Sequence, residues 1–148
     1  MLLFICRKIQ YAGQKLEKRF NPFMVNVDMK RRHFALSIVA PNGSRIAHGI
    51  KTLEVRSWTP EQLPLKDVVI VENQHYLNHN GDEEQGVAVA VADILAAHPW
   101  RKDEFEAACA TYWAEGYFAW VLDNVRPIDP PIAVPARRKI YLIEIDHP

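Results

Sequence analysis

The stretch Gly49–Trp58 reads GIKTLEVRSW and places polar side chains inside an otherwise apolar region. Its polar residues alternate with apolar Leu53 and Val55, and a period of two is typical of a β-strand. The polar face carries a hydroxyl, a carboxylate and a guanidinium, from Thr52, Glu54 and Arg56. Lys51 enters just before the strand. This pattern leaves two interpretations open, a solvated strand face or the wall of a binding cleft.

The segments around this strand predict the first part of the core. Residues 34–40 (FALSIVA) predict a strand, followed by a turn and a short helix with Asn42 as its N-cap and Gly49 at its C-terminal end. Residues 67–72 (DVVIVE) form a nearly continuous apolar run, which predicts a strand buried on both faces. Glu72 ends this run and is either a surface group or a member of a site.

The second half of the chain predicts three more strands and one helix. Residues 86–94 (GVAVAVADI) and 140–145 predict strands, and residues 117–121 (YFAWV) predict an aromatic strand. Residues 103–113 have apolar side chains at helical spacing, which predicts an amphipathic helix with Cys109 as a buried thiol. Residues 126–135 contain four prolines, which predict an extended loop.

About six strands and two helices without a βαβ rhythm favour an α+β fold. The expected architecture is a small mixed β-barrel flanked by helices. At 148 residues the chain predicts one domain with a substantial core. We expect this domain to span residues 33–148, preceded by a basic extension over residues 1–32 that is either a phosphate-binding arm or a frayed, non-native segment.

The charge distribution bounds the partners. Residues 1–32 carry eight Lys or Arg against two acids, whereas residues 33–148 carry ten against sixteen. An acidic body argues against long nucleic acids held by many phosphate contacts, unless the extension supplies the charge. The chain has no apolar run of membrane-spanning length, and its two cysteines, Cys6 and Cys109, form no CxxC pair. We therefore expect no membrane partner, reduced thiols and a cytoplasmic location.

Motifs for several chemistries are missing from the sequence. It contains no zinc-ligand spacing, no GxGxxG, no P-loop and no GxSxG, so no metal and no cofactor are predicted. The remaining candidates are Lys51, Thr52, Glu54 and Arg56, joined by Glu72 or Tyr117. A lysine beside a carboxylate suits two roles, hydrolysis through an oxyanion and proton transfer, or recognition of a base edge. The aromatics Tyr117 and Trp120 suit either core packing or base stacking.

Two segments resemble the ASCH domain, a member of the PUA-like superfamily. Gly49, Lys51, Glu54, Arg56, Ser57 and Trp58 match its Gly-x-Lys-x-x-Glu-x-Arg-Ser-Trp element. Residues 116–128 (GYFAWVLDNVRPI) resemble its later Trp-x-Leu…Arg-Pro segment. The likeness spans roughly residues 33–146, and it adds Trp58 to the candidate ligand-binding residues.

The resemblance implies a PUA-like barrel with a cleft beside a helix, and RNA or a nucleobase-like ligand as the partner. Some small ASCH proteins deacylate acetylated cytidine with a Lys-x-x-Thr pair and a distant Glu. Lys51 matches that lysine, but Glu54 stands at the threonine position and Thr52 lies two residues earlier. We therefore expect an RNA- or modified-nucleoside-binding domain. The alternative is a small amidohydrolase or ribonuclease with Lys51 and Glu54 as catalytic residues.

Overall fold

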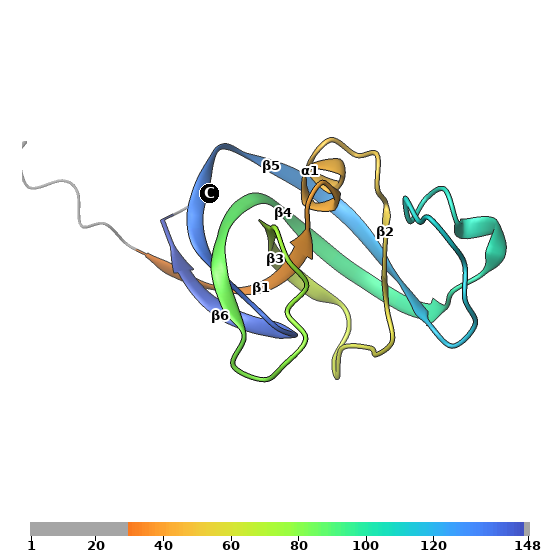
Figure 1. The fold of residues 1–148 in the computed structure, drawn as a ribbon. Helices are drawn as coiled ribbons and strands as arrows, with labels where there is room; N and C mark the ends of the chain where they lie inside the picture. The colour runs from red at the N-terminus through yellow and green to blue at the C-terminus, as the bar shows by residue number, and fades with distance from the viewer. Residues whose placement is uncertain (1–29, 147–148) are drawn as a thin grey trace, which may run out of the picture.

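The computed structural model describes residues 30–146, which form a single curved β-sheet with little helix (Figure 1). The strands are β1 (Arg31–Val39), β2 (Leu53–Arg56), β3 (Leu65–Asn73), β4 (Glu83–Pro99), β5 (Phe118–Arg137) and β6 (Ile140–Ile145). Their order is β2-β5-β4-β3-β1-β6, in which β1 and β3 are parallel and the other neighbours antiparallel. The six predicted strands are therefore confirmed, within a mixed sheet.

The sheet curls but does not close into the predicted barrel within the described residues. Strand β4 is bent by register shifts near Ala88, Val91 and Ile94, which turn the sheet toward its far edge. Hydrogen bonds that involve side chains, and not a backbone ladder, connect this end of β5 to β1 and β6. The Arg137 N–H on β5 donates to Ser37 Oγ on β1, and Tyr141 Oη on β6 donates to the Pro135 carbonyl.

Strand β5 corrects the prediction of a loop over residues 126–135. This proline-rich segment continues the strand and pairs with β4, with Pro127 opposite Ala90 and Pro135 opposite Gln85. Its other neighbour, the short β2, pairs only with residues 118–121. Beyond β2 the segment is an edge, and an edge tolerates prolines because their missing N–H groups are not needed for a ladder.

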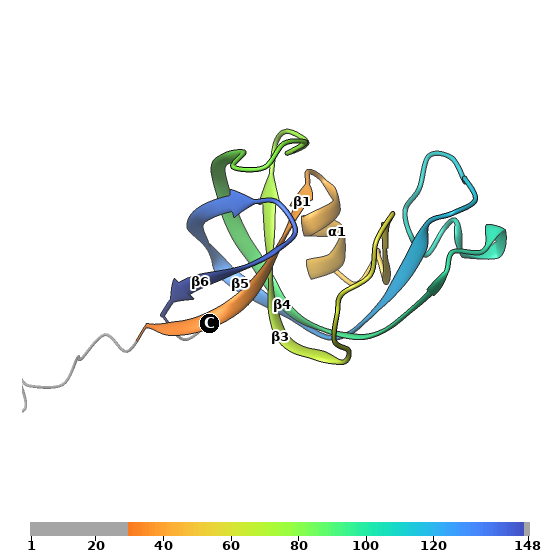
Figure 2. The same cartoon turned by 90° about the horizontal axis from the view of Figure 1, so that it is seen from below.

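The predicted helix over residues 103–113 is wrong. The structure has a 3-10 turn, η1 (Lys102–Glu104), and then irregular turns in which Cys109 has a φ of 49°. The Ala107 carbonyl accepts from the N–H groups of Thr52 and Leu53. Tertiary hydrogen bonds thus take up carbonyls that a continuous helix would use, and the expected flanking helix becomes a loop. Figure 2 shows this loop at the far end of the β4 and β5 arms.

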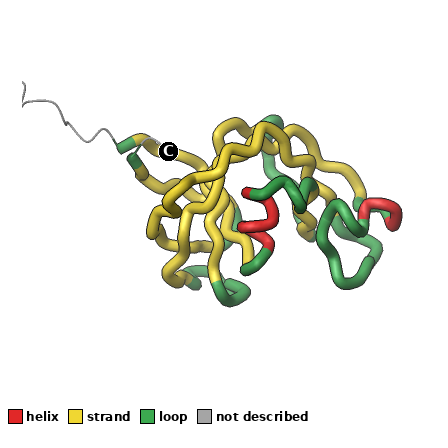
Figure 3. The backbone as a smooth tube through the Cα atoms, turned by 90° about the horizontal axis from the view of Figure 1, so that it is seen from above, coloured by secondary structure: helices red, strands yellow, loops and turns green. Residues whose placement is uncertain are grey.

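The predicted short helix is present as α1 (Asn42–Ala47), and it lies against the concave side of the sheet (Figure 3). Its N-cap is Pro41 and not Asn42, so the cap residue has no side-chain acceptor for the first N–H groups of the helix. Glu72 supplies that acceptor from β3, since its carboxylate accepts from the N–H and the hydroxyl of Ser44. The chain then turns away at Gly49, which has a φ of 73°.

The core lies in the curve of the sheet and around α1. Its largest fully buried side chain is Trp120, which belongs to the main apolar cluster together with Leu36, Ile46 and Ile70. Residues 1–29, most of the predicted basic extension, lie outside the described residues, whereas Arg31 and Arg32 belong to β1. Among the described residues, no helix has the length and apolar character needed to cross a membrane.

Candidate functional site

A cavity of about 600 Å³ opens between α1, β2 and three loops. Its walls are the end of β1, the 74–77 loop after β3, the loop around residues 108–112, and the β5–β6 turn at residues 137–139. These segments are far apart in the sequence, so the cavity is a product of the curled sheet. Its volume falls within the range of small-molecule sites.

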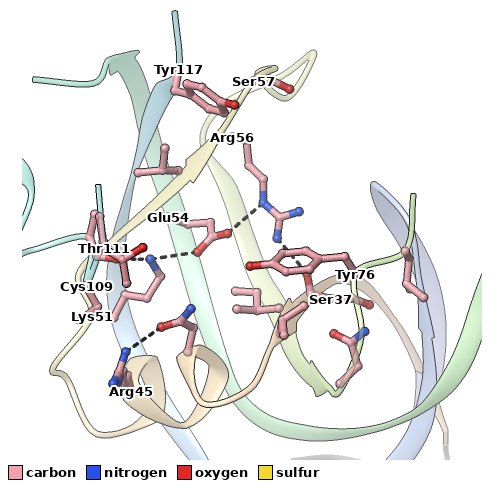
Figure 4. Close-up of a pocket in the computed structure, with 18 of the residues that line it drawn as sticks. Ser37, Arg45, Lys51, Glu54, Arg56, Ser57, Tyr76, Cys109, Thr111 and Tyr117 are labelled. Atoms are coloured by element: carbon pink, nitrogen blue, oxygen red, sulfur yellow. Dashed lines mark hydrogen bonds and ion pairs between the residues drawn. The ribbon is translucent and has the colours of Figure 1, made fainter. Parts of the chain in front are cut away.

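Lys51, Glu54 and Arg56 form a chain of charges in the wall of this cavity (Figure 4). Lys51 Nζ lies 3.3 Å from one Glu54 oxygen, and Arg56 Nε lies 2.9 Å from the other. Lys51 and Glu54 are only 5% and 6% exposed. Lys51 also donates to the Ala108 carbonyl, and Arg56 donates to the Ser37 carbonyl. Glu54 and Arg56 of the predicted polar strand face therefore line the cavity, and the Glu54 carboxylate is satisfied on both oxygens.

The cavity is strongly basic although the chain has no net charge. Within the described residues, six of the ten Lys and Arg residues after position 32 line it, against one carboxylate, Glu54. The cations are Arg45, Lys51, Arg56, Arg137, Arg138 and Lys139. Walls of one charge sign focus the potential in a cleft, so this cavity attracts anions.

Three of these cations have neutral partners. Arg45 donates to the side-chain oxygen of Asn42, and Arg138 donates to that of Asn80. Lys139 Nζ lies 4.2 Å from the centre of the Trp58 ring. In contrast, Arg137 is paired with the exposed Glu83. Because no carboxylate within residues 30–146 compensates the charge of Arg45, Arg138 and Lys139, these three cations can pair with an anionic ligand.

Tyrosines surround the mouth of the cavity. The side chains of Tyr76, Tyr112 and Tyr117 line it and are 77%, 67% and 37% exposed. They come from three different segments, the 74–77 loop, the 100–117 loop and the start of β5. In Figure 4 the ring of Tyr76 projects toward the wall that carries Glu54 and Arg56. Exposed aromatic rings beside cations are the usual means of holding unpaired bases.

The 74–77 loop that carries Tyr76 is fixed by Glu84 on β4. One Glu84 oxygen accepts from the N–H groups of Gln74 and His75 and from Nδ2 of Asn73, and the other lies 2.8 Å from His75 Nδ1. The hydrogen bond from the His75 backbone lowers the pKa of Glu84 most, and the pKa is about 2 against an ordinary 4.5. The loop is therefore held by a carboxylate that stays ionised well into acid.

Two buried polar atoms of cavity-lining residues have no hydrogen-bond partner within residues 30–146, Asn73 Oδ1 and Trp100 Nε1. The Asn73 amide is oriented by its Nδ2, which donates to the His75 carbonyl and to Glu84. An unpaired buried acceptor and donor call for a ligand or water. In the same part of the chain, no three His, Cys, Asp or Glu side chains gather as metal ligands.

Five of the eight candidate residues line the cavity, namely Lys51, Glu54, Arg56, Trp58 and Tyr117. The other three lie elsewhere. Thr52 is exposed outside the lining and uses its backbone to join the 100–117 loop to β5. Glu72 caps α1, and Trp120 is fully buried, with its Nε1 donating to the Trp58 carbonyl. Packing, one of the two roles open for Trp120, is therefore what the structure shows.

Sequence reasoning missed several lining residues. Tyr112 and Cys109 fall in the segment predicted as an amphipathic helix, yet Tyr112 is exposed and Cys109 is half-buried beside Lys51 (Figure 4). Tyr76 follows a strand end in a polar loop and gave no periodic signal. Arg138 and Lys139 belong to the one basic triplet of the body, and that triplet was the available clue to a basic wall.

This architecture defines a strand-built domain with a basic, tyrosine-rimmed cavity between a short helix and the sheet. The family model of the ASCH domain matches residues 36–132, which is well over half of the chain. The chain belongs to the ASCH domain family, whose fold is PUA-like, and family membership suggests an RNA-related function in general terms. No curated protein matches the sequence.

Proposed function

We propose that this domain binds single-stranded RNA or a nucleotide-like ligand in the cavity around Lys51, Glu54 and Arg56. The observation that carries the proposal is the concentration of six cations on the walls of a cavity in an otherwise acidic body. Phosphate groups carry the negative charge of nucleic acids, and arginine and lysine side chains bind them. The exposed tyrosines supply ring faces for unpaired bases.

In this proposal Arg45, Arg138 and Lys139 contact phosphate, because their present partners are neutral. Glu54 holds Lys51 and Arg56 in place, since its oxygens already accept from both cations. Tyr117 and Trp58 also line the cavity, and Tyr117 is 37% exposed, so its ring is open to a base. A base carbonyl would then meet Arg56, which is partly exposed.

The test is a titration of the full chain with a labelled single-stranded ribo-oligomer over a range of salt. Arg138→Ala should weaken binding and reduce the slope of log K against log salt by about 0.7, the effect of one phosphate contact. Arg32→Ala is the matched control, because Arg32 is exposed on β1 and lies five residues before Ser37, about 17 Å along the strand. Equal effects of the two substitutions would refute the cavity as the binding site.

Hydrolysis is the alternative function, with Lys51 stabilising an oxyanion and Glu54 as general base. A general base must reach the proton that it removes, and both Glu54 oxygens are engaged in ion pairs. This arrangement favours binding over hydrolysis. Incubation with acetylated cytidine and with single-stranded RNA should give no product. Turnover by the wild type that Glu54→Gln abolishes would establish the hydrolase instead.

A further inference from the structure

The charge of the cavity exceeds what one nucleotide can neutralise. Its six cations face one carboxylate, so the surplus is five, and it is still four if Glu83, the exposed partner of Arg137, is counted. A nucleoside brings no charge and a nucleoside monophosphate at most two negative charges. Charge complementarity therefore favours a ligand with several phosphates.

The cations also come from several segments around the cavity. Lys51 and Arg56 belong to the β2 wall and Arg45 to α1, whereas Arg137, Arg138 and Lys139 form the β5–β6 turn. The ring of Tyr76 projects from the 74–77 loop toward the wall that carries Glu54 and Arg56 (Figure 4). A chain of nucleotides places phosphates at successive positions, so it can contact cations from more than one of these segments.

Tyr76 combines an exposed ring with a fixed loop, which suits the stacking of a base. Its ring is 77% exposed, but its loop is not free, because Glu84 accepts from three backbone or amide N–H groups of residues 73–75. A ring held in place before binding loses little entropy when a base stacks on it. Beside it, Asn73 is 2% exposed and has an acceptor, Oδ1, without a partner among residues 30–146.

The geometry points to a second nucleotide subsite at the 74–77 loop, built by Tyr76 and Asn73 and positioned by Glu84. This inference rests on the proposed function. It adds that the ligand is an oligoribonucleotide of at least two nucleotides, with one nucleotide at the Lys51–Glu54–Arg56 wall and its neighbour on Tyr76. A mononucleotide fills only one of the two subsites.

The test compares UMP, pUpU, pUpUpU and UTP by calorimetry on the full chain. UTP carries a charge similar to that of pUpUpU but only one base, so it separates charge from a second base. We expect pUpU to bind about tenfold more tightly than UMP, the effect of one stacked base. We also expect pUpUpU to bind more tightly than UTP.

Substitutions at Tyr76 and Glu84 test whether the tighter binding of pUpU comes from the 74–77 loop. Tyr76→Ala should weaken pUpU binding by more than UMP binding and so remove the advantage of pUpU, whereas Tyr76→Phe, which keeps the ring, should retain this advantage. Glu84→Gln should remove part of the advantage, and Tyr76→Ala combined with Glu84→Gln should lose no more than Tyr76→Ala alone. The positioning role of Glu84 is then separated from a general loss of structure, because UMP binding serves as the internal reference.

Other outcomes overturn the inference. Equal affinities for UMP and pUpU, equal affinities for UTP and pUpUpU, or an equal loss for UMP and pUpU in Tyr76→Ala would each exclude a second subsite at this loop. In those cases the proposed function stands as long as binding of the single-stranded ribo-oligomer falls in Arg138→Ala and not in Arg32→Ala. If none of the four ligands binds, the proposed function itself fails.

Discussion

At the scale of single residues, Glu54 shows how a site motif can also hold the fold. Its carboxylate lies between Lys51 and Arg56 and is only 6% exposed. Removal of one partner from a buried ion pair leaves uncompensated charge in a poorly solvated place. The identity of this residue is therefore constrained by stability as well as by a ligand.

Glu54→Ala should lower the free energy of unfolding by about 3 kcal/mol, because it strands the buried Lys51 ammonium. Urea denaturation measures this loss. The matched control is Glu83→Ala, which breaks the exposed pair with Arg137 and should cost less than about 1 kcal/mol. A loss for Glu54→Ala as small as that of the control would contradict the structural role of the buried carboxylate.

Glu84 sets a pH dependence of stability. Its pKa is about 2 in the folded protein against an ordinary 4.5, so the folded state binds fewer protons than the unfolded state between these values. The stabilisation from Glu84 is thus complete above about pH 4.5 and is lost as the pH falls toward 2. Urea denaturation at pH 6 and pH 3 should show a smaller acid-induced loss for Glu84→Gln than for the wild type. Parallel losses would count against this prediction.

At the scale of elements, the 100–117 loop decides the shape of the cavity. Helical spacing of apolar residues predicted a helix here, but the carbonyls of Ala107 and Ala108 accept from β2 and from Lys51 instead. A helix would need Cys109 at negative φ, whereas it lies at 49°. Hydrogen bonds to a distant segment thus outweigh a local pattern.

Substitutions at Cys109 distinguish the loop from a helix. Cys109→Gly should be more stable than Cys109→Ala by about 1 kcal/mol, because glycine adopts positive φ without a steric penalty. In a helix interior the order would be reversed by a similar amount. Thermal or urea denaturation of the two variants measures the difference, and greater stability of the alanine variant would restore the helix prediction.

The contact between β3, β4 and β5 depends on Gly86. A Cβ atom at this position would lie 2.7 Å from Val71 Cγ1 and 3.1 Å from Ala136 Cβ. Gly86→Ala should therefore destabilise the protein by about 1–3 kcal/mol through overpacking. Val87→Ala, at the exposed neighbouring position, should cost less in the same denaturation experiment. A neutral Gly86→Ala would mean that the strands separate more easily than the packing indicates.

At the scale of the whole molecule, charge is divided between the cavity and the rest. Residues 30–146 carry 13 Lys or Arg against 16 Asp or Glu, although the cavity alone has a surplus of five positive charges. The surface outside the cavity is consequently acidic. An acidic surface repels a duplex that must lie across it, whereas a single strand can enter the basic hollow.

We therefore predict that a single-stranded ribo-oligomer binds at least tenfold more tightly than a duplex of the same length. Competition binding at about 100 mM salt measures the ratio, since salt at that level screens charges beyond about 10 Å. The same measurement after deletion of residues 1–28 is the control for the basic extension. Tighter duplex binding that disappears with this deletion would place recognition in the extension and away from the cavity.

The sequence by itself determined the six strands, the short helix and the family, because periodicity and the GIKTLEVRSW motif are local and need no partner. It also determined that Lys51, Glu54 and Arg56 belong together, since they share one strand and its approach. It could not predict Tyr76, Tyr112 or the β5–β6 turn as neighbours of that motif. Their approach depends on where the bulges of β4 bend the sheet.

Only the tertiary structure decided which residues of the polar strand face line a cavity. The curl of the sheet brings the basic turn and the tyrosine loops close to Glu54 and Arg56, which line a basic cavity, whereas Thr52 is exposed outside it. The tertiary structure also decided that Glu72 accepts a hydrogen bond from the first turn of α1 and that Trp120 is buried in the core. Electrostatic potential and burial arise from all the surrounding segments together, and a linear pattern does not contain that sum.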